Sequence, residues 1–389
     1  MNILFDLIAS QPEGNLKYHG GSEYAKAVFR AILSKTQGRL FCLYDSQKNL
    51  DEEISSICKI NGIPLIDIRI VLNAEDIIER YSIERFYSAL PLEKSIQQIL
   101  PFNPHVRSII TIHGLRSIEL TSDINEIRYI TGFYKKLKFV YKNLFPGKYT
   151  DKLLFRIKAL INNYYKPTII TVSNYSGLSL KYFIPEIPQK DIHILYSPIT
   201  DYSQIITDDS FLVLNNINPG KYFLLLSAGI WQKNSYRILS AFSSLIKSKL
   251  SEGYKFVVTG ALDSMKKSFP GTSFIYFDYL ERQELETLLK NAHALVYPSL
   301  NEGFGYPPLE AFKYGTGVIA SAIGPVMEVC GNAALYFNPY SLTEMKIRLM
   351  QSINDPVFKD NASKRIDQYA KIKYKQMNDL EELAELICN

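Results

Sequence analysis

The segment 295–315, LVYPSLNEGFGYPPLEAFKYG, constrains the fold more than any other part of the chain, because it orders an apolar strand, a glycine turn and a helix start. Residues 295–297 are an apolar run of strand type, and Gly303 and Gly305 allow the backbone to turn closely around a ligand. A proline at position 307 or 308 suits the first helical position, where no amide hydrogen is needed. The segment therefore predicts a strand–loop–helix unit whose free amides face an anion.

A carboxylate stands at each end of this turn. Glu302 precedes the glycines, and Glu310 lies about one turn into the expected helix. Carboxylates accept hydrogen bonds from hydroxyl groups, so two of them in one cavity suit a ligand rich in hydroxyls, such as ribose or a hexose. We predict that both side chains reach one such cavity.

The nine residues from Glu302 to Glu310 resemble the E-x7-E signature of retaining glycosyltransferases of the GT-B fold, and the string EGFGYPPLEA resembles glycosyltransferase family 4. The resemblance implies an α/β protein of the GT-B class, with two Rossmann-like domains facing each other across a cleft. It extends, in the order of the family, to segments 20–21, 171–176, 229–234, 256–260 and 315–320.

Apolar strands alternate with amphipathic helices in both halves of the chain, which predicts parallel sheets wrapped by helices. We expect a Rossmann-like acceptor domain over 1–200, a turn-rich linker over 201–220 and a Rossmann-like nucleotide-sugar donor domain over 221–370. In 371–389 we expect a helix over 378–387, which by the resemblance packs back on the first domain. The expected strands are 2–9, 40–44, 108–113, 222–228, 255–259 and 294–297, and the expected helices include 22–34, 235–248 and 282–291.

Composition excludes several classes of protein. With 47% hydrophobic and 21% charged residues, the 389-residue chain has the make-up of a globular protein, and no apolar run reaches the ~18 residues of a membrane-spanning helix. The N-terminus reads as a buried strand and not as a signal peptide. Because the four cysteines show neither metal-ligand spacing nor a disulfide framework, we expect a cytoplasmic protein.

The net charge of +5 is concentrated in residues 133–166. This segment contains nine lysines and arginines, which alternate with aromatic residues, and Asp151 is its only acidic residue. One interpretation, which we favour, is a helical face whose lysines border the core. The other is a contact with an anionic membrane surface, at the inner face of the membrane, or with a lipid-linked acceptor. We expect no nucleic acid partner, because no recognised binding module accompanies these bases.

Lys233 follows a predicted strand and precedes a predicted helix, so its ammonium would lie near the cavity of Glu302. A cation in that place can neutralise a departing diphosphate. The resemblance implies that Lys233 is the phosphate-binding lysine of the family. The arginine that many members carry shortly before this lysine is replaced by Ile230.

Two further sites lie in the first half of the chain. The pair Gly20 and Gly21 precedes a predicted helix, where the backbone can approach a phosphate, although capping by Ser22 explains the same pattern. His113 ends a predicted strand, and the resemblance implies that it contacts the donor sugar near the reacting carbon. Gly114 replaces the aspartate that usually follows it.

The resemblance assigns the remaining donor contacts. Glu310 would hold the nucleotide ribose and Glu302 the sugar hydroxyls, while the amides of Gly303, Phe304 and Gly305 would face the phosphates. The base would rest near Tyr279 and Leu280, with Gly260 allowing close approach. Ser173 and Asn174 open a predicted helix and read as its cap.

The sequence contains no Asp-x-Asp motif and no His, Asp or Glu cluster with metal spacing. We therefore predict a metal-independent reaction without a cofactor, in which a nucleotide diphosphate sugar is the co-substrate.

These observations predict a retaining hexosyltransferase with His113, Lys233 and Glu302 as catalytic residues. Its donor would be a nucleotide diphosphate sugar and its acceptor a hydroxyl of a surface polysaccharide or lipid-linked glycan. The PPLE string resembles members that use GDP-mannose, with UDP-linked hexoses as an open alternative. The alternatives are a nucleotide-sugar epimerase of the same fold, a non-catalytic glycan- or nucleotide-binding protein, and a nicotinamide oxidoreductase. Pro308 stands in place of the third glycine that the last would require.

Overall fold

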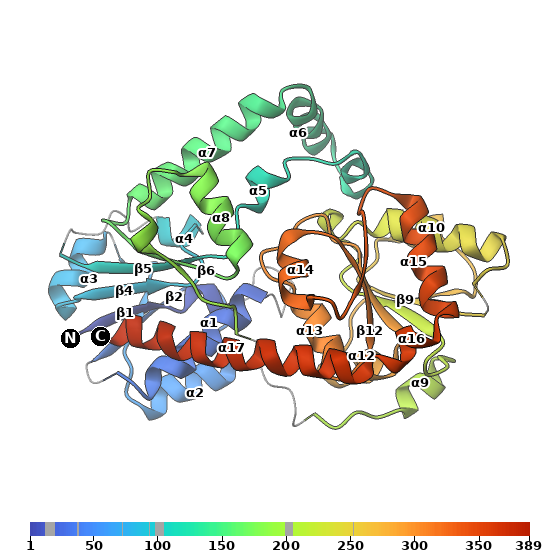
Figure 1. Cartoon of the computed structure of the whole chain (residues 1–389). Helices are drawn as coiled ribbons and strands as arrows, with labels where there is room; N and C mark the ends of the chain where they lie inside the picture. The colour runs from blue at the N-terminus through green and yellow to red at the C-terminus, as the bar shows by residue number, and fades with distance from the viewer. Residues whose placement is uncertain are drawn as a thin grey trace. The chain divides into compact units, whose positions relative to one another are not determined.

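The computed structural model describes residues 1–11, 20–36, 39–71, 73–92, 94–97, 105–198, 205–251 and 253–389. It consists of two compact units (Figure 1). Unit 1 contains residues 1–118, 150–200 and 373–389, and unit 2 contains residues 119–149 and 201–372. Among the helices of these described ranges, none is long and apolar enough to cross a lipid bilayer.

Unit 1 is built on a seven-stranded sheet of order β3-β2-β1-β4-β5-β6-β7, in which every pairing is parallel. The central strands are buried on both faces, as the continuous apolar runs of the sequence require. The strand order reverses between β1 and β4, which makes their carboxyl ends the switch point of the sheet. The strands are β1 (Ile3–Asp6), β2 (Leu40–Tyr44), β3 (Leu65–Asp67), β4 (Arg85–Ser88), β5 (Arg107–Ile112), β6 (Thr168–Thr171) and β7 (Ile192–Ile194). The helices are α1 (Gly20–Leu33), α2 (Glu52–Ile60), α3 (Ala74–Tyr81), α4 (Lys94–Gln97), α5 (Arg116–Glu119), α7 (Pro146–Asn162) and α8 (Asn174–Phe183), with the 3-10 turns η1 (Ile8–Ser10) and η3 (Gln189–Asp191). The last residue of α5 and the first four residues of α7 belong to unit 2.

Unit 2 repeats this plan with a six-stranded parallel sheet of order β10-β9-β8-β11-β12-β13. Its switch point lies between β8 and β11. The strands are β8 (Tyr222–Leu225), β9 (Lys255–Thr259), β10 (Phe274–Phe277), β11 (Ala294–Tyr297), β12 (Gly317–Ser321) and β13 (Leu335–Phe337). The helices are α6 (Phe133–Leu144), α9 (Ser210–Leu214), α10 (Ser235–Lys247), α11 (Asp263–Ser268), α12 (Arg282–Asn291), α13 (Tyr306–Phe312), α14 (Gly324–Cys330), α15 (Leu342–Asn354) and α16 (Pro356–Asp360), with the 3-10 turns η2 (Ile124–Tyr129) and η4 (Trp231–Lys233).

The expectation of an α/β protein with two Rossmann-like domains is therefore confirmed. Strands 40–44, 255–259 and 294–297 and helix 282–291 have the predicted bounds. The strand predicted over 222–228 ends earlier, because Ser227 has a positive φ of 56° that an extended strand does not allow.

The assignment of residues 119–149 to the first domain is wrong, because side-chain contacts join them to unit 2. The Asp123 carboxylate accepts two hydrogen bonds from the Arg237 guanidinium, at 3.0 and 2.9 Å. The ring of Tyr129 stands edge-on to that of Tyr236, with ring centroids 5.3 Å apart. These pairs are more than 100 residues apart in sequence, so no local pattern announces them.

The expected linker is not uniformly irregular. Residues 210–214 of it form α9, while residues 201–204 lie outside the described ranges.

The final helix is much longer than the predicted 378–387. Helix α17 (Ala362–Cys388) begins in unit 2 and contributes residues 373–388 to unit 1 (Figure 1). Part of its buried side is polar: Gln376 donates to the Ser197 carbonyl at 2.5 Å, and Asp379 accepts from the Tyr196 amide at 2.7 Å. An apolar periodicity detects only the last turns, where Leu383, Ala384 and Ile387 are buried.

Strand β1 ends at a buried carboxyl. Asp6 is 1% exposed; it accepts a hydrogen bond from the Ser88 hydroxyl at 2.6 Å and another from the Ile8 amide at 3.0 Å. The second bond turns the chain from the strand into η1, which explains why the strand predicted over 2–9 is short. Burial raises the pKa of the Asp6 carboxyl from 3.8 to about 6, against the opposing effect of these hydrogen bonds.

This raised pKa predicts a pH dependence of stability. Between pH 3.8 and pH 6 the folded protein holds a proton at Asp6 that the unfolded chain has released, so raising the pH destabilises the fold. When the pH is raised from 3.5 to 7.5, the free energy of unfolding of unit 1 in Asp6→Asn should rise by about 3 kcal/mol relative to that of wild type. Urea unfolding at the two pH values measures this gain, and a difference that stays constant with pH would contradict the prediction.

Candidate functional site

The carboxyl ends of β8 and β11 place two loops side by side at the switch point of unit 2. One loop leads from β8 to η4, and the other leads from β11 to α13. The amide of Leu300 donates to the carbonyl of Gln232 at 2.8 Å, so the backbones of the two loops are joined directly. Open parallel sheets bind ligands at such a point, beyond the carboxyl ends of their strands.

Lys233 and Glu302 meet between these loops. The Lys233 ammonium lies 2.6 Å from a Glu302 carboxylate oxygen and 3.2 Å from the Tyr297 hydroxyl, and 4.7 Å from the centre of the Tyr297 ring. The two charged side chains are 16% and 8% exposed. A cation and a carboxylate that are largely removed from water thus stand at the switch point, as predicted for Lys233 and Glu302.

Glycines allow the loop after β9 to approach the loop after β8 closely. Gly260 has a φ of +63°, which favours glycine, and its amide donates to the Phe277 carbonyl at 2.8 Å. The sequence did not single out Gly229 for this role, although a Cβ there would lie 2.7 Å from the Gly260 carbonyl oxygen. Tyr279 and Leu280 follow β10, the next strand along; Tyr279 is 52% exposed and Leu280 is half-buried.

The glycine turn of the motif leads into a helix as predicted, but Tyr306 and not a proline is the first residue of this helix. Gly305 has a φ of +128° and is the N-cap of α13, whose first turn contains proline. Phe304 is 3% exposed, so its side chain packs inward, while Gly303 is half-buried.

Glu310 has a different partner from Glu302. The Arg282 guanidinium donates to a Glu310 carboxylate oxygen at 2.7 Å and also to Glu286, which is 1% exposed. Lys313 lies 3.2 Å from Glu286, which also accepts from the Tyr314 hydroxyl. The predicted common cavity of the two acids stays a prediction. Sequence reasoning missed Arg282; its signal was the i, i+4 spacing to Glu286 at the start of α12.

His113 lies directly after β5, at the carboxyl edge of the unit 1 sheet. Its Nε2 is 3.1 Å from the Ala89 carbonyl oxygen, and its ring stands edge-on to Tyr24 of α1, with centroids 4.7 Å apart. A carbonyl only accepts hydrogen bonds, so Nε2 carries the proton and Nδ1 is the acceptor in the neutral ring. Gly114, the next residue, has a φ of 145°, a backbone conformation that favours glycine.

The glycine pair lies on the helix that contacts this histidine through Tyr24. Gly20 and Gly21 are the first two residues of α1, one turn before Tyr24. The helix predicted over 22–34 begins two residues earlier, so that the pair lies in it and does not precede it. The alternative, capping by Ser22, does not hold either, because Ser22 lies within the helix and is buried. Ser173 does act as a cap, since its hydroxyl accepts from the Ser176 amide at 3.1 Å before α8.

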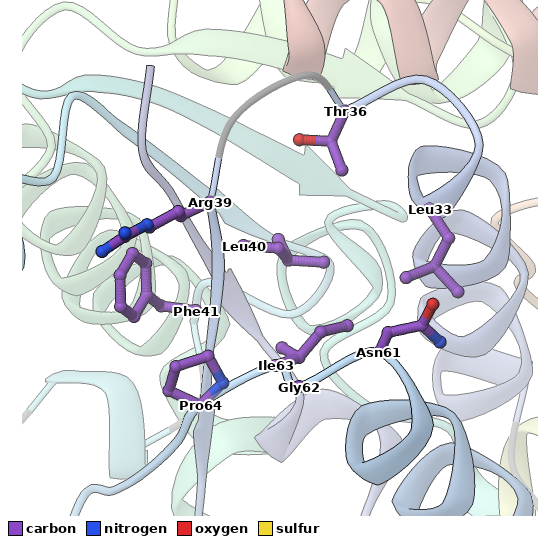
Figure 2. Close-up of a pocket in the computed structure, with 9 residues that line it drawn as sticks. All are labelled: Leu33, Thr36, Arg39, Leu40, Phe41, Asn61, Gly62, Ile63 and Pro64. Atoms are coloured by element: carbon purple, nitrogen blue, oxygen red, sulfur yellow. The ribbon is translucent and has the colours of Figure 1, made fainter.

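A cavity of about 420 Å³ lies elsewhere in unit 1, near the amino end of β2 (Figure 2). Since the strands are parallel, this is the sheet edge opposite to Asp6 and His113. The cavity therefore takes no part in the candidate site. Its lining residues are Leu33, Thr36, Arg39, Leu40, Phe41, Asn61, Gly62, Ile63 and Pro64.

In the parts of the chain that the structure describes, no three His, Cys, Asp or Glu side chains are grouped so that they could hold a metal ion. The prediction of metal independence is not tested by this observation.

The sequence is similar to known sugar-transferring proteins. Residues 210–373 match the family described as Glycosyl transferases group 1. The O-antigen chain mannosyltransferase RfbU of Salmonella typhimurium is 55% identical over 56 residues, which are 14% of this chain and 16% of that relative. The match thus spans about a sixth of the length of this curated relative.

Solved structures with little sequence similarity share the whole fold. Sucrose-phosphate synthase of Thermosynechococcus elongatus is 12% identical and has a TM-score of 0.71, with 99% of this chain and 98% of that chain covered. Anabaena HepE, solved with UDP and glucose, is 13% identical with a TM-score of 0.63, and 100% and 99% of the two chains are covered. The chain therefore has the GT-B fold predicted from its sequence, and its residues 210–373 match the model of the Glycosyl transferases group 1 family.

Proposed function

We propose that this protein is a retaining glycosyltransferase that transfers a hexose from a nucleotide diphosphate sugar to a glycan hydroxyl. The observation that carries the proposal is the pair of Lys233 and Glu302, which stands at the switch point of the group 1 domain. Diphosphate and sugar offer a negative charge and hydroxyl donors, the two groups that a lysine and a carboxylate bind best.

The pair suits a reaction in which charge separates. As the bond to the departing diphosphate breaks, the sugar carbon becomes positive and the phosphates gain negative charge. Lys233 would stabilise the phosphates, and Glu302 would accept hydrogen bonds from the sugar hydroxyls. Without a donor, each charge is compensated by the other at 2.6 Å, so binding exchanges partners and leaves neither buried charge unpaired.

Glu310 would bind the hydroxyls of the nucleotide ribose. Its carboxylate is held by Arg282, which in turn is fixed by the buried Glu286. Such a chain of charged hydrogen bonds reduces the number of positions that the Glu310 side chain adopts. The base would rest near Tyr279 and Leu280, beside the loop of Gly260.

His113 would contact the donor sugar near the reacting carbon, and Gly20 and Gly21 would approach the phosphates. Both lie at the carboxyl edge of the unit 1 sheet, and Tyr24, one turn after the glycines on α1, contacts the His113 ring. With Nε2 donating to Ala89, Nδ1 is the ring nitrogen that can act as an acceptor.

The names of the similar proteins favour particular substrates. RfbU is named as an O-antigen chain mannosyltransferase, and HepE was solved with UDP and glucose. We propose mannose from GDP-mannose as the donor sugar and a surface polysaccharide or its lipid-linked precursor as the acceptor, with the reaction at the inner face of a membrane. A UDP-linked hexose is the alternative donor, and epimerisation of the bound sugar is the alternative reaction.

Substitutions of the central pair test the proposal. Lys233→Ala and Glu302→Gln should each lower donor turnover by a factor of roughly 10² to 10³, because each removes a group that stabilises separating charge. A screen of nucleotide sugars, with and without acceptor, measures this loss and separates transfer from epimerisation. The exposed Lys247→Ala on α10 is the matched control.

The double variant Lys233→Met/Glu302→Gln separates chemistry from folding, because it leaves no unpaired charge. It should be stable and inactive. Unchanged turnover in both single variants, or restored turnover in the double variant, would disprove the assigned roles.

Arg282→Met should weaken binding of a nucleoside diphosphate roughly tenfold or more, since Glu310 loses the charged hydrogen bond that orients it. Binding of the 2′,3′-dideoxy analogue should be weak in wild type and unaffected by the substitution. Arg282→Lys should restore part of the affinity. Calorimetry measures all of these, and an equal loss for both nucleotides would mean that Arg282 only supports the fold.

The reaction should proceed without a metal ion, because Lys233 supplies the positive charge at the phosphates. Turnover should therefore be the same before and after treatment with a chelator. Strong inhibition that magnesium reverses would contradict this prediction.

A further inference from the structure

Helix α6 turns its apolar face outward. Six large apolar side chains of the helix are 45–86% exposed, and Phe145 directly after it is 47% exposed. At about 100° per residue they fall within one arc of about 140°. The helix is therefore amphipathic, but the side that would normally enter a core is in contact with solvent. The six residues are Phe133, Tyr134, Leu137, Val140, Tyr141 and Leu144.

A buried ion pair sets this orientation. Lys142, which falls on the opposite side of α6 from the apolar arc, is 7% exposed and donates to the Glu126 carboxylate. Its ammonium also lies 5.5 Å from the centre of the Trp231 ring. Because Glu126 and Trp231 hold Lys142 against the rest of unit 2, the apolar arc on the other side of α6 faces away from that unit.

The next helix behaves differently, although its composition is similar. Ile157 and Ile161 of α7 are buried in the unit 1 core, and Leu153 and Leu154 pack against it. The interpretation of residues 133–166 as a core-facing helix therefore holds for α7 and fails for α6.

The charges around the apolar arc have one sign. Lys136 and Lys138 flank it on its two sides, Lys135 lies behind it, and Lys148 follows; all four are exposed. From Ile127 to Thr150 the sequence contains no acidic residue. Pairing of this surface with a second copy would bring like charges together, which disfavours a dimer.

We propose that α6 docks on an anionic lipid surface. Aromatic and aliphatic side chains within one arc enter the interface between headgroups and acyl chains, while lysines at the rim of the arc meet the negative headgroups. This partner covers the apolar arc and compensates the lysines at the same time. The proposal does not depend on glycosyl transfer, because lipid binding is measured without any substrate.

The docking helix is joined to the candidate site of unit 2. Trp231, which contacts Lys142, is two residues before Lys233 in η4. Glu119, in the same segment 119–149, accepts from the Asn301 side chain at 2.5 Å, next to Glu302. A lipid surface bound by α6 would therefore lie within a few helix diameters, ~10 Å each, of the loops of the central pair.

Sedimentation with vesicles tests the proposal on the full chain. Wild type should bind vesicles of phosphatidylcholine with phosphatidylglycerol, bind pure phosphatidylcholine weakly, and lose most of the binding at high salt. Leu137→Glu/Tyr141→Glu and Lys136→Glu/Lys138→Glu should each lower the partition coefficient at least about tenfold. Val213→Glu/Leu214→Glu on α9, where the side chains are 77% and 80% exposed, is the matched control and should bind like wild type.

Other outcomes would overturn the proposal. One is equal binding of wild type and both α6 variants to anionic vesicles. Another is a change in oligomeric state of the α6 variants without lipid, which light scattering detects and which would assign the face to a second copy. Acceptor-free donor hydrolysis in lipid-free buffer should be the same in wild type and the α6 variants, so that loss of lipid binding is distinguished from failure of the proposed reaction.

Discussion

The parallel pairing of β8 with β11 is the constraint on which the candidate site depends. Parallel strands bring their carboxyl ends to one edge, so the loops of Lys233 and Glu302, 69 residues apart, start side by side. The Leu300 amide then joins the loops through the Gln232 carbonyl. The strand order reverses here, and open parallel sheets bind ligands at such a switch point. A lysine and a glutamate that would be ordinary surface residues elsewhere become a largely buried pair.

Other charged side chains of unit 2 are also paired with opposite charges. Glu310 is compensated by Arg282, and Glu286 by Arg282 and Lys313. An unpaired charge at such low exposure would cost several kcal/mol of folding free energy. A carboxylate can therefore stand at these positions without a ligand only if a cation pairs with it. Each of these carboxylates, like that of Glu302, is paired with a cation. A ligand that enters between Lys233 and Glu302 would replace the contact between these two side chains with contacts of its own, which favours ligands that carry both hydroxyl donors and a negative group.

Sequence reasoning succeeded where a pattern is local and failed where contacts are distant. The strand–glycine–helix segment predicted β11, Gly305 and α13, because each follows from neighbouring residue types. The Arg282–Glu310 pair was missed, since nothing near position 310 indicates a partner on α12. The length of α17 was underestimated because Gln376 and Asp379 are buried through hydrogen bonds and not through apolar character. Residues 119–149 were assigned to the wrong unit because Asp123 finds Arg237 only in the folded chain.

Helices α6 and α7 show why composition does not decide orientation. Both are basic and aromatic, and a pattern of apolar positions predicts a core-facing side for each. In α7 the apolar side is buried, with Ile157 and Ile161 in the core. In α6 the Lys142–Glu126 pair is buried instead, and Phe133, Leu137 and Leu144 face solvent. A helix held by a salt bridge leaves its apolar arc exposed, whereas a helix held by its apolar arc has that arc covered. The orientation of α6 thus follows from one buried ion pair, and the exposed hydrophobic patch of the kind that marks interaction sites follows from that orientation.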